Sequence, residues 1–112
     1  TPKALGAILG HEGTHSVWNH NPPSLPAWVT QAQRSANSID EEYNCFKNQT
    51  EFWVLKRGAD RNLSLDYWVR IFEQGRNKQE SFAEIYGEEY AQGIAEEYVK
   101  DEVRNLYDLP EY

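Results

Sequence analysis

The sequence predicts a mainly α-helical protein of about five helices, folded as a single domain over residues 1–112. Two observations support this prediction. Apolar residues recur at intervals of three and four along most of the chain, which is the period of a helix that buries one face. Capping residues, prolines and glycines separate these runs, and no stretch shows the strict alternation of a half-buried strand. At 112 residues the chain is long enough to build a hydrophobic core.

The first predicted helix occupies residues 2–19. Thr1 can act as its N-cap, and Pro2 suits the first helical position because an N–H there has no intrahelical partner. The segment 20–23 should end the helix, since its two prolines cannot continue it. Residues at three- and four-residue spacing define one face of this helix: Ala4, Ile8, His11, His15 and Trp18.

A short helix is expected over residues 27–36, and a longer one over residues 39–57. Ser38 is the predicted N-cap of the longer helix, and Glu41 stands at the third helical position to complete a capping box. Gly58 follows the last turn, as helix ends prefer. The apolar stripe of this helix consists of Ile39, Tyr43, Phe46, Thr50 and Trp53.

The C-terminal half predicts two further helical regions. One covers residues 65–74, with Ser64 as its N-cap and Gly75 at its end. The last begins after Asn77 and runs to about residue 107, with a bend expected at Gly87 or Gly93.

The motif His11-Glu12-Gly13-Thr14-His15 fits the HExxH pattern of zinc peptidases. Residues four apart lie on one face of a helix, so both imidazoles can reach one zinc ion at roughly 2.0–2.1 Å. Glu12 projects to the side, where it can deprotonate a water activated by the metal. The alternative is a core helix with two surface histidines and a solvated glutamate.

A catalytic zinc normally has a third protein ligand, and we expect it on the helix over residues 39–57. The metzincin extension is absent, because Trp18 and Asn21 occupy its glycine and ligand positions. At about 100° per residue, Glu42 lies roughly 55° from the centre of the apolar stripe and Glu41 roughly 155° away. Glu42 is therefore the predicted ligand, with Glu41 in reserve and pointing to solvent. The alternative is that Glu42 only borders the core, with its carboxylate in water.

Cys45 follows on the same helix. It is the single cysteine and cannot form an internal disulfide, so we expect a small buried apolar group, with metal ligation as the alternative.

With this second helix, the chain resembles the gluzincins, zinc metallopeptidases whose third ligand is a helical glutamate. It is particularly similar to small bacterial zincin-like domains, over about residues 4–57. The resemblance implies zinc bound by His11, His15 and Glu42, with Glu12 as general base and acid. Zincin domains usually place a small β-sheet before the active-site helix, and this sheet is not evident here. We therefore expect a processed or excerpted product, or a sheet supplied otherwise.

The charge distribution limits the classes of partner. Residues 1–76 carry eight basic and eight acidic groups, whereas residues 77–112 carry three and ten, which gives the whole net charge of −7. Nucleic-acid binding is disfavoured, because no basic patch exists to neutralise phosphates. The sequence contains no run of about 18 apolar residues, so it predicts no membrane span. The acidic C-terminal helix could meet a protein partner or steer basic peptides, or it could be a solvated face.

The sequence thus predicts a zinc-dependent metallopeptidase that acts on a peptide or protein substrate. Residues 1–58 would hold the metal-site helices, and residues 59–112 a C-terminal helical subdomain. His20, Tyr86 and Tyr90 are candidate donors to the developing oxyanion, and His20 and Trp28 are candidates for substrate contacts. The rival functions are a non-catalytic helical binding or structural module, and a zinc amidase that acts on cell-wall peptide.

Overall fold

The computed structural model describes the backbone of residues 1–20 and 31–107 and the side chains of residues 1–15 and 38–106. The protein is mainly α-helical, as predicted, and the described residues contain no strand. Four helices account for this part of the chain: α1 (Pro2–His20), α2 (Gln31–Lys56), α3 (Leu63–Tyr86) and α4 (Glu88–Tyr107). None of them is long and apolar enough to cross a membrane.

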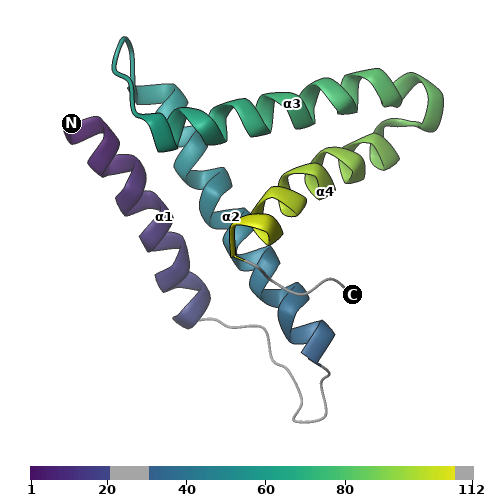
Figure 1. Ribbon diagram of the computed structural model, residues 1–112, viewed down its shortest axis with the longest axis horizontal. Coiled ribbons are helices and arrows are strands. Elements are labelled where there is room, and N and C mark those ends of the chain that lie inside the picture. Colours follow the sequence, from purple (N-terminus) through teal and green to yellow (C-terminus); the bar gives the residue numbers. More distant parts are fainter. Residues whose placement is uncertain (21–30, 108–112) are drawn as a thin grey trace.

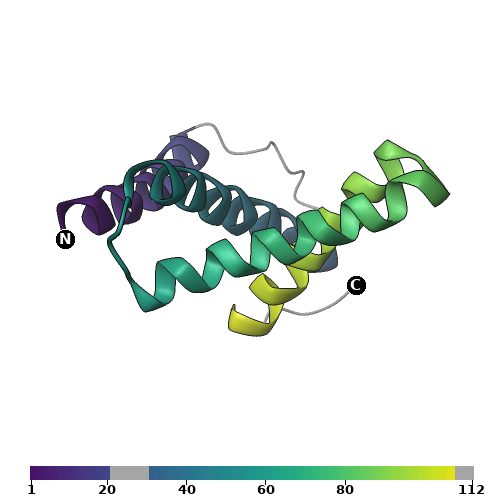
Figure 2. The same cartoon turned by 90° about the horizontal axis from the view of Figure 1, so that it is seen from above.

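The helices form two antiparallel pairs (Figures 1 and 2). α1 lies beside α2, and α3 lies beside α4 after a tight turn. α2 also packs against α3 and against α4, so it joins the two pairs. The arrangement places the first half of α2 next to the second half of α1, and these two segments carry the candidate ligands predicted from the sequence.

α1 begins as the sequence predicts. The Ala4 N–H donates to Thr1 Oγ1 at 3.1 Å, so Thr1 caps the helix. The buried face differs by one position from the predicted one. Ala7 is fully buried, whereas Ile8 is 45% exposed, because the small side chain of Ala7 lets α1 approach α2 closely. Close approach also explains Gly6, where an added Cβ would lie 2.7 Å from the Phe52 ring.

α2 is longer than predicted. It is continuous from residue 31, so Ser38 is not an N-cap and the capping box with Glu41 is wrong. No proline or glycine lies between residues 31 and 56, and a serine alone does not stop a helix whose later turns are held by tertiary packing. The predicted helix end is confirmed, because Gly58 adopts a positive φ of 56° just after the last turn.

α3 and α4 also differ from the prediction at their boundaries. Asn62, not Ser64, caps α3, since its side chain accepts a hydrogen bond from the Leu65 N–H. The helix continues through Gly75 and ends at Gly87, whose φ is 90°. Gly75 is buried, and an added Cβ would lie 3.2 Å from the Ala95 carbonyl oxygen of α4. This glycine therefore serves helix packing and does not end a helix.

Two apolar clusters form the core. The first joins α1, α2 and α3 and consists of Ala4, Ala7, Trp53, Leu65 and Val69. The second joins α2, α3 and α4 and consists of Phe46, Trp68, Ile71, Val99 and Val103. Since α2 contributes to both, residues 1–58 and 59–112 share their core.

Candidate metal centre

The two motif histidines face α2 from α1. His11 is buried, with 8% of its surface exposed, and the His15 side chain is half-buried. Their Nε2 atoms lie 3.2 Å apart. The spacing of four residues on α1 therefore brings the two imidazoles together, as predicted, with the Nε2 atom of each directed at the same point.

Glu42 completes a group of three donors. Its Oε1 lies 3.0 Å from His15 Nε2, and its Oε2 lies 3.6 Å from His11 Nε2. Zinc bonds of about 2.0–2.1 Å place neighbouring donors of a tetrahedron about 3.3–3.4 Å apart. One Glu42 oxygen thus lies near each histidine nitrogen, and the 3.2 Å between the two Nε2 atoms is close to the spacing that a shared zinc ion requires. The structure brings Glu42 beside the histidine pair, as the helical stripe predicts.

Two buried atoms of this group lack a partner. In the described part of the chain, Glu42 Oε2 and His11 Nδ1 make no hydrogen bond. The Gln49 amide is near enough to raise the pKa of His11 slightly, yet no hydrogen bond of good geometry reaches Nδ1. A buried carboxylate oxygen without a donor is costly, and a bound cation would remove that cost. The residues present therefore fit a divalent metal.

The protonation of His11 also suits metal binding. Burial lowers the pKa of its imidazole below the usual value, while the nearby carboxylate of Glu42 opposes that shift. The neutral imidazole is the form that binds a metal.

Glu41 belongs to the centre and does not point to solvent, contrary to the prediction. Its Oε2 accepts a short hydrogen bond from His15 Nδ1, and both side chains are 22% exposed. The prediction was wrong because it measured Glu41 against the apolar stripe alone, whereas α1 packs on a face of α2 from which both Glu41 and Glu42 reach His15. With Nδ1 donating to Glu41, the Nε2 lone pair of His15 is free to face His11 Nε2 and the Glu42 carboxylate.

Glu12 occupies the open side of the centre. Its side chain is exposed, and its charge acts on both His11 and Cys45. Beside it, an added Cβ at Gly13 would meet nothing within 4 Å, so the space around the motif is free of other described atoms there. The Glu12 side chain is thus open to solvent and near enough for its charge to act on two buried groups of the centre.

A polar link between the helices holds the motif in place. Thr14 Oγ1 donates to the Gly10 carbonyl oxygen at 2.9 Å and accepts from Asn48 Nδ2, also at 2.9 Å. Neither Thr14 nor Asn48 is a candidate site residue from the sequence alone. Thr14 is one of the two variable positions of the motif, and Asn48 follows Glu42 by six residues, so only the antiparallel pairing of α1 and α2 reveals the contact.

Phe46 and Cys45 form the buried wall of the centre. The Phe46 ring meets the His11 ring edge-on at 4.7 Å and stacks on Trp68 at 3.9 Å. Cys45 is fully buried, as predicted, and its Sγ lies within 4.8 Å of a ring nitrogen of each histidine. Burial, together with the charges of nearby glutamates, raises the pKa of the thiol to about 12.

The predicted oxyanion donors are not brought to this centre. Tyr86 and Tyr90 flank the α3–α4 turn, which Figure 1 shows far from α1, and both are largely exposed. The reason is that α3 and α4 project away from α1 as a separate pair. The side chain of His20 and the whole of Trp28 lie outside the described residues.

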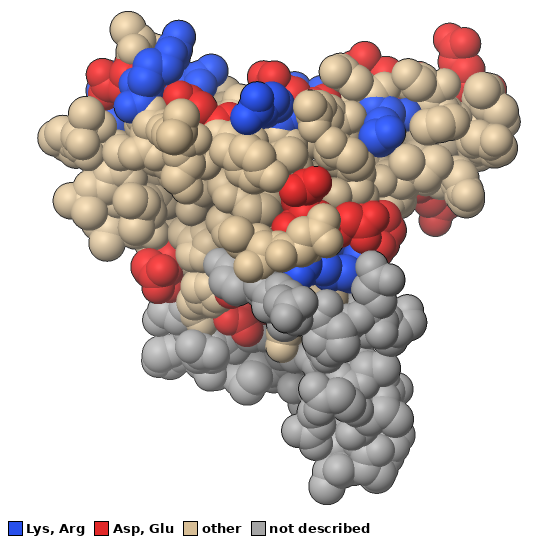
Figure 3. All heavy atoms as spheres, in the orientation of Figure 1, with Lys and Arg blue, Asp and Glu red and all other residues tan. Residues whose placement is uncertain are grey.

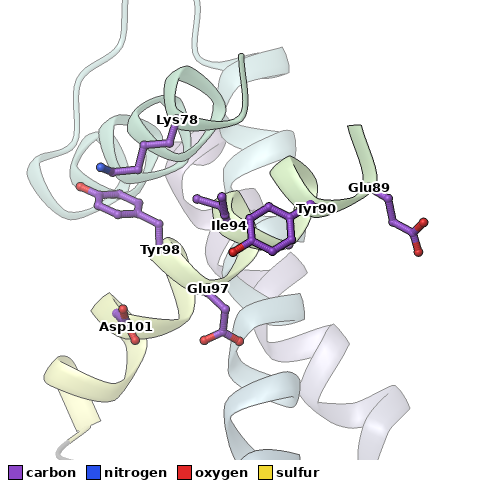
Figure 4. Close-up of a pocket in the computed structure, with 8 residues that line it drawn as sticks. Lys78, Glu89, Tyr90, Ile94, Glu97, Tyr98 and Asp101 are labelled. Carbon is purple, nitrogen blue, oxygen red and sulfur yellow. The ribbon is translucent and has the colours of Figure 1, made fainter. Parts of the chain in front are cut away.

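A surface groove of about 650 Å³ lies away from the metal centre, between Lys78 of α3 and one face of α4 (Figure 4). Its lining residues on α4 are Glu89, Tyr90, Gly93, Ile94, Glu97, Tyr98 and Asp101. Lys78 Nζ lies 5.3 Å from the centre of the Tyr98 ring. Figure 3 shows basic and acidic side chains interspersed along the edge formed by α3 and the α2–α3 connection, with further acidic and basic groups below them.

No protein-family model, curated protein or solved structure matches this chain.

Proposed function

We propose that this protein is a zinc-dependent metallopeptidase in which His11, His15 and Glu42 hold the metal. The observation that supports the proposal is the convergence of these three side chains at mutual distances of 3.0, 3.2 and 3.6 Å, beside the exposed carboxylate of Glu12. Three protein donors leave a fourth coordination position for water or substrate, which distinguishes a catalytic zinc site from a structural one.

The bound ion would act as a Lewis acid that activates water and polarises the scissile carbonyl. Glu12 takes the proton of the attacking water and later returns it to the leaving amine. Its exposure places this carboxylate where substrate can arrive. Glu41 holds the imidazole of His15 in one tautomer and orientation. The Phe46 ring excludes water from the inner side of His11.

The test combines metal content with peptide cleavage. The purified chain, loaded with zinc at neutral pH, should bind about one equivalent by elemental analysis and cleave members of a peptide library. Glu12→Gln should keep the metal and lose nearly all cleavage, because it removes the proton acceptor without removing a ligand. Glu73→Gln, on the exposed surface of α3, is the matched control and should cleave normally.

Two results would contradict the proposal. A chain that takes up no zinc has no metal centre, and a Glu12→Gln variant that cleaves at the wild-type rate has another mechanism. A panel that includes cell-wall peptides separates a peptidase from a zinc amidase.

The groove on α4 favours a second candidate function, the binding of a basic amphipathic helix of a protein partner. The apolar side chains Tyr90, Ile94 and Tyr98 form its floor, and carboxylates line its rim. A labelled lysine-rich amphipathic peptide should bind with an affinity that falls as salt rises. Tyr90→Ala should weaken this binding, whereas Ile85→Ala, an exposed apolar change outside the groove, should not. Equal binding by both variants would argue against the groove.

A further inference from the structure

We propose that Cys45 is a fourth protein ligand of the metal centre, which gives the centre a closed resting state. This inference rests on the proposed metal site, but it does not depend on hydrolysis. The side chain is fully buried, and its Sγ and one ring nitrogen of each of His11 and His15 all lie within 4.8 Å of one another.

The placement follows from α2. Glu42 and Cys45 are three residues apart, so they lie on one face of the helix, and that face is turned toward α1. Zinc–sulfur and zinc–nitrogen bonds of about 2.3 and 2.0 Å require donor atoms about 3.5 Å apart. The sulfur therefore needs to approach each of the two nitrogens by about 1.3 Å at most.

The Cys45 thiol and the exposed residues of the motif differ in their access to solvent. Glu12 and the open space at Gly13 lie on the exposed side, whereas Cys45 belongs to the buried wall. When the sulfur binds, its S–H bond breaks, a sulfur–metal bond forms and the proton passes to solvent. The tetrahedral shell is then complete, so water or a carbonyl oxygen must displace the sulfur before it can bind.

The donor set also determines which metals the centre prefers. Two imidazoles, a carboxylate and a thiolate suit borderline and soft ions such as Zn²⁺, Co²⁺ and Cd²⁺, and they do not suit Mg²⁺ or Ca²⁺. A centre without sulfur would discriminate less strongly in favour of Cd²⁺.

Cobalt absorption tests the proposal directly. Co²⁺ added to the full chain should produce an intense near-ultraviolet sulfur-to-cobalt charge-transfer band together with the visible bands of a tetrahedral ion. Cys45→Ser should still bind Co²⁺ but lose the near-ultraviolet band. Its affinity for zinc should fall on the order of tenfold or more, because loss of a ligand costs at least as much as loss of a residue that orients one. Glu12→Gln, which removes no ligand, should keep the band.

The outcomes separate this inference from the proposed function. If wild type binds Co²⁺ without the near-ultraviolet band, Cys45 is not a ligand, while the three-donor centre stands. If wild type binds neither Co²⁺ nor Zn²⁺, the metal centre itself fails, and the role of Cys45 fails with it. The wild-type spectrum decides the question even if a substitution at this buried position prevents folding.

Discussion

Glu41 offers a sharp test of the proposed metal centre, because the proposal assigns it the orientation of His15 and not metal binding. Glu41→Gln keeps the size of the side chain and an oxygen that can accept the hydrogen bond from His15 Nδ1, but it removes the negative charge. The pair is only 22% exposed at both side chains, so solvent screens it less than it screens a surface ion pair. The substitution should therefore weaken zinc binding measurably without abolishing it.

The expected loss of zinc affinity depends on whether the substituted carboxylate binds the metal or orients a ligand. Partners that orient a metal-binding histidine are typically worth about 10–100-fold in affinity, or about 1.4–2.7 kcal/mol. Glu42→Gln, which replaces an anionic metal ligand 3.0 Å from His15 Nε2 by a neutral amide in the proposed centre, should cost more than Glu41→Gln. Glu51→Gln, a change at an exposed position of the same helix, is the control and should cost nothing measurable.

Competition against a chromophoric chelator at neutral pH measures all three variants on one scale. The expected order of zinc affinity is wild type equal to Glu51→Gln, then Glu41→Gln, then Glu42→Gln. The reasoning is refuted if Glu41→Gln binds zinc as tightly as wild type, since His15 would then need no orienting carboxylate. It is also refuted if Glu41→Gln loses more affinity than Glu42→Gln, because the two residues would then have exchanged roles.

Two predictions concern the fold that supports the centre. Gly75→Ala should lower the free energy of unfolding by about 1 kcal/mol in urea denaturation, because the added Cβ would press on the Ala95 carbonyl of α4. Gly93→Ala, which has open space around it, should raise the free energy of unfolding by up to about 1 kcal/mol. Equal shifts in the two variants would show that α3 and α4 are not closely packed. The hydrogen bond from Trp53 Nε1, with help from a neighbouring guanidinium, holds the pKa of Asp66 below its usual value. The charge of Asp66 therefore stabilises the fold above the unfolded pKa of about 4. This contribution is lost as the pH falls through the folded pKa. Asp66→Asn should therefore be less stable than wild type by about 1 kcal/mol at pH 7, and this difference should shrink as the pH falls below about 4. Thermal melts of both proteins at several pH values measure the difference. A difference that does not change with pH would contradict this role of the charge.

The sequence predicted the parts of the site that depend on local helical geometry. Residues 11 and 15 lie on one face of any α-helix, and Glu42 borders the apolar stripe of α2 whatever the partner helix is. Glu41 was misplaced because its contact with His15 depends on which face of α2 packs against α1, and the apolar stripe of α2 alone does not show this. The contact from Asn48 to Thr14 depends on the pairing of two helices, and periodicity within one helix carries no information about it.

The same distinction explains the errors in the C-terminal half. A glycine can end a helix or allow another helix to approach, and the sequence looks alike in both cases. Gly75 and Gly87 differ only in their surroundings. Gly75 faces the backbone of α4, whereas Gly87 adopts a positive φ and has open space around it. The assignment of the first as a helix end therefore failed where tertiary packing decided the outcome.

The second helix pair has a direct physical connection to the metal centre, which argues against regarding it as a passive addition. Lys100 of α4 pairs with Asp40 at 2.7 Å, immediately before the two glutamates of the centre, and its Nζ lies 5.5 Å from the Tyr43 ring just after them. Trp68 of α3 supports Phe46, which in turn packs on His11. Both ends of the ligand-bearing turn of α2 are thus held by residues beyond position 58. Because metal affinity depends on fractions of an ångström, the precision of the proposed centre should depend on α3 and α4, although neither carries one of the proposed ligands.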